Sequence, residues 1–342
     1  MKPIRLGPNQ LHRFYRGGEA IARFRGLDSA DDAAPEDWVG STVTTFGDTS
    51  TGLSTLPDGS TLRDALAADP EAFLGPEHAV RHGADPALLV KLLDAGERLP
   101  IHSHPDDDFA DSRLGVPYGK TEAWLIVEAR GEPTTVHLGF SEDVDADTLS
   151  GWVERQDTAT MLAVMNELPV AAGDCIFVPA GVPHSLGEGI LMVELQEPSD
   201  LSVLLEWAGF DFDGTSEGHL GIGFEAALES VTRRTITADE LRQLKRSVDD
   251  APELRPGARS LLPAEADAYF RAERLRPHPA TALEPAYSLL VVVEGHGGIE
   301  TEAGGTLDLA RGETVLVPYA AGAAELSGSV DVIRCLPPGE EH

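Results

Sequence analysis

The sequence predicts a mostly β protein with helical insertions. Glycine and proline are frequent, with 35 and 24 copies in 342 residues, as expected of a chain with many turns between short strands. Apolar segments with turn residues at short intervals run from Leu89 to Val203 and resume from about residue 265 to the C-terminus. Segments with helical periodicity separate these strand-rich parts. The chain is long enough for two domains.

The first helical segment is expected within residues 59–86. Ser60 or Thr61 is a candidate N-cap, because the apolar residues that follow recur at helical spacing. Asp69 precedes Pro70, and proline is favoured in the first turn of a helix, so a second short helix is expected to begin there. The simplest interpretation is a helical insertion into a β domain.

Two further segments have helical character. Residues 141–166 interrupt the strand-rich part, and residues 216–250 follow it. In the second segment Thr237 precedes Glu240 by three residues, which is the pattern of a capping box. Residues 249–257 are rich in proline and charge and are interpreted as a linker.

These boundaries predict two β domains. The helical insertion is expected to divide the first domain, and the second helical segment is expected to join it to the second domain. The first β domain is expected at residues 1–58 and 87–215, with the helical insertion at residues 59–86. The helical segment and its linker are expected at residues 216–258, and the second β domain at residues 259–342.

The chain is strongly acidic, with a formal net charge of −32. A field of this sign repels nucleic acids and anionic lipids, so neither is an expected partner. Any phosphate group would have to be held by a locally positive site. Lysine is scarce, with copies only at Lys2, Lys91, Lys120 and Lys245.

The sequence also favours a cytoplasmic location. No apolar run approaches the length of a membrane span, and no basic-then-apolar leader opens the chain. Cys175 and Cys335 both lie in apolar, strand-like segments, so buried free thiols are expected rather than a disulfide.

Two short motifs predict a metal site. His102 and His104 form an H-x-H pair that follows Gly96 after five residues, and His184 ends a P-x-G-x-x-H segment. Residues i and i+2 of a strand point to the same face, so the first two imidazoles should face one interior. Three imidazoles together with the carboxylate of Glu122 can hold one divalent ion.

These two motifs resemble the signature motifs of the cupin barrels, although Glu122 comes later after H-x-H than the cupin glutamate usually does. The segment from Gly312 to Pro318 repeats the opening of the His184 motif, but it continues with Tyr319 and has no histidine. The resemblance implies two jelly-roll barrels with a metal site only in the first. Residues 259–342 are therefore expected to form a metal-free cupin domain.

Longer segments resemble the type I mannose-6-phosphate isomerases, from roughly Leu6 to the C-terminus. The segments are L-L-V-K-L-L-D-A from Leu88, H-S-H-P-D-D from His102, G-K-T-E-A-W from Gly119, P-A-G-V-P-H from Pro179 and E-L-Q-E-P-S-D from Glu194. The resemblance implies a zinc-dependent aldose–ketose isomerase that interconverts mannose 6-phosphate and fructose 6-phosphate through an enediol.

The resemblance also implies the residues that hold the metal. One zinc ion per chain would be bound by His102, His104, Glu122 and His184. The donor set does not exclude Fe²⁺ or another divalent ion, which leaves open a metal-dependent oxygenase of the cupin type. The G-K-T-E segment at Gly119 favours the isomerase.

Four further residues are candidates for contact with a sugar. Lys120 lies two residues before Glu122, so on a strand it faces the same interior. Lys120 and Glu194 are the candidate catalytic residues, with His102 a third candidate for proton transfer. Lys91 and Arg98 are cations near the metal motif in sequence and are the candidates for substrate binding.

Three positions depart from the family pattern. His102 stands where the family usually has glutamine, Pro100 where a phosphate-binding serine is common, and Leu204 where an active-site arginine is typical. Leucine cannot replace a cationic, bidentate contact, so weaker action on mannose 6-phosphate is expected. The alternatives are an isomerase of another sugar or sugar phosphate and a metal-containing, sugar-binding cupin without catalysis. The sequence does not indicate an oligomeric state.

Overall fold

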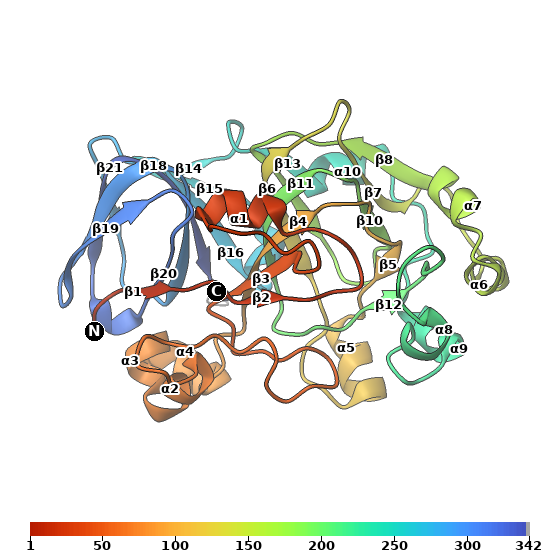
Figure 1. The fold of residues 1–342 in the computed structure, drawn as a ribbon, viewed down its shortest axis with the longest axis horizontal. Helices are drawn as coiled ribbons and strands as arrows, with labels where there is room; N and C mark the ends of the chain where they lie inside the picture. Colours follow the sequence, from red (N-terminus) through yellow and green to blue (C-terminus); the bar gives the residue numbers. More distant parts are fainter. Residues whose placement is uncertain (340–342) are drawn as a thin grey trace.

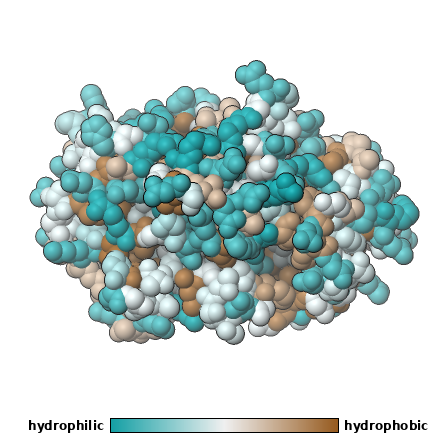
Figure 2. Space-filling model, in the orientation of Figure 1, coloured by the Kyte–Doolittle hydropathy of each residue, from teal (hydrophilic) through white to brown (hydrophobic). Residues whose placement is uncertain are grey.

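The computed structural model describes residues 1–339, and it is mostly β, with short helices arranged around three sheets (Figure 1). The predicted fold class is therefore confirmed at this level, while the division into two barrels stays a prediction. The last three residues of the expected second domain, 340–342, lie outside the described part. Figure 2 shows that hydrophilic side chains cover much of the visible face, in keeping with the acidic composition.

Two sheets surround the predicted metal motifs. Within residues 1–339, the seven-stranded sheet contains, in spatial order, β13 (Lys245–Ser247), β9 (Asp174–Val178), β6 (Glu122–Ala129), β11 (Ile190–Gln196), β4 (Leu89–Ala95), β3 (Glu36–Val39) and β2 (Gln10–Leu11). The five-stranded sheet of the same part contains β12 (Val203–Leu204), β5 (His102–Ser103), β10 (His184–Leu186), β7 (Thr135–Phe140) and β8 (Met165–Pro169).

The C-terminal part forms the third sheet, seen on the left of Figure 1. In the described residues its main path contains β1 (Ile4–Leu6), β20 (Thr314–Val317), β18 (Ser288–Thr301), β21 (Ala324–Leu336), β16 (Arg271–Leu275), β15 (Ala258–Ser260) and β14 (Glu253–Arg255). Off this path, β17 (Ala280–Leu283) pairs with β21 and β19 (Gly305–Ala310) pairs with β18. β1 pairs with β20, so the first residues of the chain join the C-terminal sheet.

The helices are all short. They are α1 (Glu19–Arg25), α2 (Leu62–Ala68), α3 (Pro70–Leu74), α4 (Pro76–His82), α5 (Asp107–Phe109), the π-helix η1 (Ala110–Leu114), α6 (Ala146–Arg155), α7 (Thr158–Ala163), α8 (Gly214–Glu217), α9 (Phe224–Ala227), α10 (Ala238–Leu244) and the 3₁₀ helices η2 (Leu228–Ser230), η3 (Ala264–Ala268) and η4 (Tyr319–Ala321). Within residues 1–339, no helix combines the length and the apolar character needed to cross a membrane.

The predicted helix starts are confirmed. The Thr61 side chain accepts a hydrogen bond from the backbone N–H of Asp64, and Asp69 caps α3. Thr237 and Glu240 form the predicted capping box at the start of α10. Residues 249–257, interpreted as a linker, contain β14, which pairs with β15.

Two hydrophobic clusters hold the sheets together. Leu191 of β11 and Val291 of β18 belong to one buried cluster, so the seven-stranded and C-terminal sheets share a core. Trp124 of β6 and Met192 of β11 pack in a second cluster with Leu138 of β7, which joins the seven-stranded and five-stranded sheets. Burial of such side chains contributes roughly 1.5–3 kcal/mol each, and these contacts fix the positions of β5, β6 and β10, which carry the metal motifs.

Candidate metal centre

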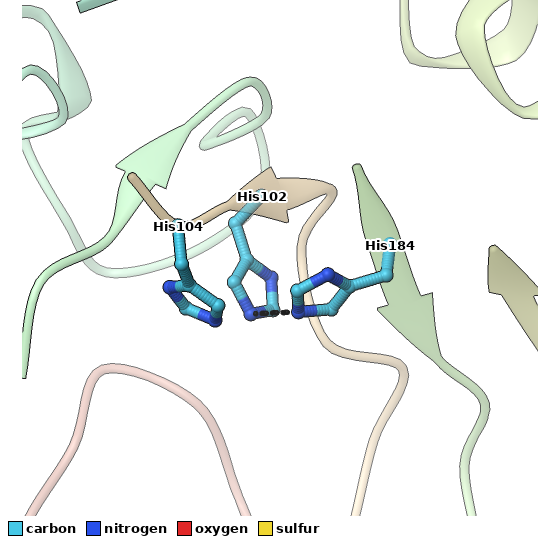
Figure 3. A group of neighbouring side chains, drawn as sticks. All are labelled: His102, His104 and His184. Atoms are coloured by element: carbon cyan, nitrogen blue, oxygen red, sulfur yellow. Dashed lines mark hydrogen bonds between the residues drawn. The ribbon is translucent and has the colours of Figure 1, made fainter. Parts of the chain in front are cut away.

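Three histidines converge on one point, one from β5, one from the residue that follows β5, and one from the neighbouring strand β10 (Figure 3). β10 pairs antiparallel with β5 so that His184 lies directly opposite His102, and His104 follows two residues later. One nitrogen from each imidazole lies within 4.8 Å of the others. The predicted meeting of these three side chains is therefore present.

Backbone carbonyls fix the tautomer of each imidazole. Each Nδ1 lies at hydrogen-bond distance from a carbonyl oxygen, and because a carbonyl only accepts, each Nδ1 must carry the proton. The carbonyls for His102, His104 and His184 belong to Pro100 at 2.8 Å, Leu201 at 2.6 Å and Val182 at 2.9 Å, respectively. This arrangement leaves every Nε2 unprotonated, with a lone pair that can accept a hydrogen bond or bind a metal ion.

The lone pairs of His102 and His184 face each other. Their Nε2 atoms are 3.0 Å apart, and two unprotonated nitrogens cannot hydrogen-bond to each other. Burial lowers the pKa of both rings, that of His102 well below its ordinary value. It also lowers the pKa of His104 to about 3. All three rings are therefore neutral near pH 7, and their facing lone pairs suit a shared cation.

Glu122 completes the donor set. Its Oε1 lies 3.2 Å from Nε2 of His184 and its Oε2 lies 3.3 Å from Nε2 of His104. The indole of Trp124 donates to Oε1 at 2.8 Å. Burial opposes ionisation of Glu122, but Lys120 and the histidines outweigh it and hold its pKa well below its ordinary value. Three imidazole nitrogens and one carboxylate suit Zn²⁺, so these residues fit the predicted metal.

Lys120 and Glu194 lie beside this donor set. Lys120 Nζ donates to Glu122 Oε2 at 2.7 Å and lies 3.2 Å from Glu194 Oε1 and 3.0 Å from His104 Nε2. Lys120 is 5% exposed and Glu194 is 2% exposed. Burial raises the pKa of Glu194 to about 7, although Lys120 works against this. Both predicted catalytic residues therefore contact each other at the metal centre.

A cavity opens over the metal centre, between the seven-stranded and five-stranded sheets. The lining includes the predicted residues His102, Glu122, His184, Lys120, Glu194 and Lys91. Lys91 Nζ lies 3.4 Å from Glu36 Oε2 and 5.0 Å from the centre of the Trp38 ring. Lys91 is thus inside the cavity and already paired with a carboxylate.

Arg98, which we expected to contact the substrate, pairs with Glu206 instead of facing the cavity. It is not among the described residues that line the cavity. Its Nη1 donates to Glu206 Oε2 at 2.8 Å and to the carbonyl of Leu99 at 3.0 Å. Because the carboxylate of Glu206 is 2% exposed, it needs a cation nearby, and Arg98 supplies it.

The departures noted in the sequence lie at the cavity wall. Pro100 and Leu204 both line it, and Leu204 of β12 lies opposite His102 of β5. Leu204 is 4% exposed. An apolar side chain therefore stands next to the metal centre where the family resemblance implies an arginine.

Arg13, which no sequence pattern indicated, also lines this cavity. Its Nη2 donates to Asp200 Oδ1 at 2.5 Å and its Nε to Glu36 Oε1 at 2.9 Å. Burial opposes the charge of Arg13, but Asp200 and Glu36 raise its pKa well above the ordinary value. Arg13 is 187 residues from Asp200 in the chain, so no local pattern could have revealed the pairing.

The fold and these side chains define a β protein with a buried cluster of three histidines and one glutamate that could hold a metal ion, and the proteins it resembles are mannose-6-phosphate isomerases. The chain is 30% identical over 176 residues to GmuF of Bacillus subtilis (strain 168), described as a probable mannose-6-phosphate isomerase. That alignment covers 51% of this chain and 51% of GmuF, so it spans about half the length of this relative. No protein-family model matches the chain.

Solved structures share the whole fold. The crystal structure of the mannose 6-phosphate isomerase from Bacillus subtilis superposes with a TM-score of 0.77 at 24% identity, covering 98% of this chain and 99% of that one. A mannose 6-phosphate isomerase described as bound with zinc and yttrium gives a TM-score of 0.73 at 16% identity, covering 99% and 100%. At these identities the solved structures show that the fold is shared, and the curated relative is similar over about half of the chain.

Proposed function

We propose that the chain is a zinc-dependent aldose–ketose isomerase that interconverts mannose 6-phosphate and fructose 6-phosphate. The observation that carries this proposal is the placement of Lys120 and Glu194 beside the histidine and glutamate cluster on the wall of one cavity. The similarity to mannose-6-phosphate isomerases supports the substrate class, and the relative described as bound with zinc supports the metal.

The reaction moves a proton between two neighbouring carbons of an open-chain sugar. The proton leaves C2 and is delivered to C1 of the enediol, while a hydroxyl proton moves from O2 to O1, so the composition is unchanged. A bound Zn²⁺ would supply Lewis-acid chemistry that favours negative charge on the sugar oxygens. His102, His104, His184 and Glu122 would hold it.

The protein groups that handle protons are Lys120 and Glu194. Glu194 is the proposed base, because its carboxylate lines the cavity without belonging to the histidine cluster. Lys120 donates to Glu122 at 2.7 Å and lies 3.2 Å from Glu194, so its ammonium can steady that carboxylate and offer a hydrogen bond to a sugar oxygen. Trp124 donates to Glu122 and keeps it oriented.

Arg13 is the proposed phosphate contact in place of the arginine missing at Leu204. It lines the same cavity, and a guanidinium can bind phosphate through two parallel hydrogen bonds. Asp200 and Glu36 occupy its donors in this structure, so substrate would have to compete with them. Lys91 is the second candidate cation.

A second candidate function is the isomerisation of a sugar that carries no phosphate. The position of Leu204 at the cavity wall favours it. The cations Arg13, Lys91 and Lys120 are also matched by four carboxylates of the lining, those of Glu36, Glu122, Glu194 and Asp200. A neutral sugar would need no unpaired cation.

A substrate comparison with the zinc-loaded protein tests the two candidates. If the first holds, kcat/KM for mannose 6-phosphate exceeds that for mannose by about a hundredfold or more, since a charge-assisted contact is worth roughly 1.5–3 kcal/mol. Arg13→Gln then lowers kcat/KM for mannose 6-phosphate about tenfold to a hundredfold and leaves the value for mannose within about threefold. The matched control is Arg23→Gln, because Arg23 is exposed and pairs with Glu128.

Equal or better use of mannose would favour the second candidate. Absence of isomerisation with phosphorylated and free sugars alike would contradict both.

The domain division and the cellular location are also proposals. The division into two cupin barrels, with the metal only in the first, is supported by the separate apolar clusters that fill the C-terminal sheet and the metal-bearing part. A cytoplasmic location is supported by Cys175 and Cys335, which are both buried and free.

A further inference from the structure

A second cavity carries a concentration of arginine that the proposed function does not use. It lies between the helical insertion and the C-terminal sheet, and Figure 1 shows α2, α3 and α4 directly beneath that sheet. Its lining includes Arg81 of α4, Arg255 of β14, Arg271 of β16 and Arg334 of β21. We call it the arginine cavity. Within residues 1–339, its lining shares no residue with the cavity over the metal centre.

The charges of this cavity do not balance. Among residues 1–339, four arginines face three glutamates in the lining, although the chain as a whole carries a net charge of −32. One of the glutamates, Glu273, already serves two arginines: Arg255 Nη2 donates to it at 2.7 Å, and Arg334 Nη1 lies 3.5 Å away. The other two glutamates of the lining are Glu77 and Glu284. The described part of the lining therefore carries a local excess of cation in an acidic protein.

Two buried donors of the arginine cavity have no partner among the described residues. These are Nε of Arg334 and the hydroxyl of Tyr287, in side chains that are 4% and 1% exposed. A buried donor left unsatisfied costs about 1–3 kcal/mol, and such groups are rare enough to need a cause. Both lie in the wall of the same cavity, which a bound acceptor would explain.

Arg271 offers further donors. Its Nε donates to the carbonyl of Pro337 at 3.2 Å, and its guanidinium carries further N–H groups beyond that one. It is partly exposed, as an entry position requires. The neighbouring His78 and His82 also line the cavity, and burial lowers the pKa of both, so near pH 7 they add hydrogen-bonding capacity without charge.

We propose that the arginine cavity binds a small oxyanion of the phosphate-monoester class. Guanidinium forks match phosphate oxygens, and here the donors come from α4, β14, β16 and β21 on several sides of the space. Arg271 and Arg81 meet the anion first, and Arg334 with Tyr287 form the floor. Because the ligand joins the helical insertion to the C-terminal sheet, binding stabilises the contact between them.

Inorganic phosphate is the probe for this site. The zinc-loaded chain is titrated calorimetrically with phosphate, and its Tm is followed at constant ionic strength in chloride. Phosphate raises Tm. Arg271→Gln weakens binding at the arginine cavity about tenfold, the loss expected for one charge-assisted contact. The matched control Arg13→Gln, in the cavity over the metal centre, leaves that binding event unchanged.

Tyr287→Phe gives a second readout that a purely structural tyrosine would not produce. Without phosphate its Tm equals or exceeds that of the parent chain, because an unpaired buried hydroxyl has been removed, while the rise caused by phosphate becomes smaller. Succinate at equal ionic strength gives less than about a third of the phosphate response, because planar carboxylates fit a site with donors on several sides poorly.

Three results would overturn the proposal. The first is unchanged phosphate binding in both Arg271→Gln and Tyr287→Phe. The second is loss of all phosphate binding in Arg13→Gln, which would place the anion at the metal centre. The third is an equal response to succinate. None of these measurements depends on isomerase activity, so the proposal stands or falls separately from the proposed function.

Discussion

The same sequence pattern occurs in the part that carries the histidine cluster and in the C-terminal sheet, with different outcomes. Gly173 precedes β9, which ends just before Pro179, and Gly312 precedes β20, which ends just before Pro318. After Pro179 the chain enters β10 and brings His184 to the metal centre. After Pro318 it forms the 3₁₀ helix η4 instead.

The interiors of the two regions differ accordingly. The metal-bearing part buries His104, His184 and Glu122 at 2%, 1% and 2% exposure. In the C-terminal sheet a cluster of aliphatic side chains occupies the interior, including Leu290 and Val332. The glycine and the proline therefore mark the two ends of a strand. The side chains that follow the proline decide whether the interior holds potential metal-binding residues or a hydrophobic core.

Removing a metal ligand tests this contrast most strongly. His104→Ala and His184→Ala should each lose bound zinc and lower isomerase activity about a thousandfold or more, since the loss of Lewis-acid stabilisation removes several kcal/mol from the transition state. Metal analysis and initial rates measure both effects. The matched control is His296→Ala, a histidine of β18 in the C-terminal sheet, which should keep metal and rate. Stoichiometric zinc in the doubly substituted chain would refute the assignment.

Shortening a core side chain in each region gives a smaller effect. Leu290→Ala in the C-terminal sheet and Leu138→Ala beside the metal centre remove side chains that are fully buried. Each should cost about 2–5 kcal/mol of unfolding free energy. Denaturant unfolding measures the cost, and zinc titration separates the variants: only Leu138→Ala should weaken metal binding. Equal zinc affinity in both would show that the strands around the metal centre are held without this core.

The sequence predicted the meeting of the three histidines because their motifs are local. His102 and His104 are two residues apart, and the glycine and proline of the His184 motif mark the turns around it. Helix starts were predictable for the same reason, since the capping box at Thr237 and Glu240 lies within one turn. The extent of the sheets was not, because strand pairing such as that of β1 with β20 joins residues about 310 apart.

Ion pairs between residues far apart in the chain could not be predicted from the sequence either. Arg13 lines the cavity and pairs there with Asp200. Arg98 lies outside the cavity and pairs with the buried carboxylate of Glu206. Neither carboxylate is near its arginine in the chain, so nearness in sequence to the metal motif was a poor guide to which cations face the cavity. Charge pairing inside a fold is decided by which buried carboxylates need a partner.

The smallest predicted effect is a difference in pH dependence between one carboxylate of each region. Burial raises the pKa of Glu197, near the metal centre, to about 8, with help from Asp107. The unfolded chain loses this proton near pH 4.5, so the folded chain holds it more tightly, and stability falls as pH rises from about 4.5 to 8. Glu197→Gln removes this penalty.

In the C-terminal sheet the sign is reversed. Burial opposes ionisation of Glu273, but Arg255 and Arg334 outweigh it and hold its pKa below the ordinary value. The ionised Glu273 carboxylate therefore stabilises the folded chain above the pKa that it has in the unfolded chain. This stabilisation is lost as the pH falls through its lower pKa in the folded chain. Relative to the parent chain, Glu197→Gln should gain about 1–3 kcal/mol between pH 5 and pH 8, whereas the cost of Glu273→Gln should shrink only on acidification below about pH 4.5. Urea unfolding across pH 3.5 to 8 measures both, and parallel profiles for the two variants would contradict the opposite signs argued here.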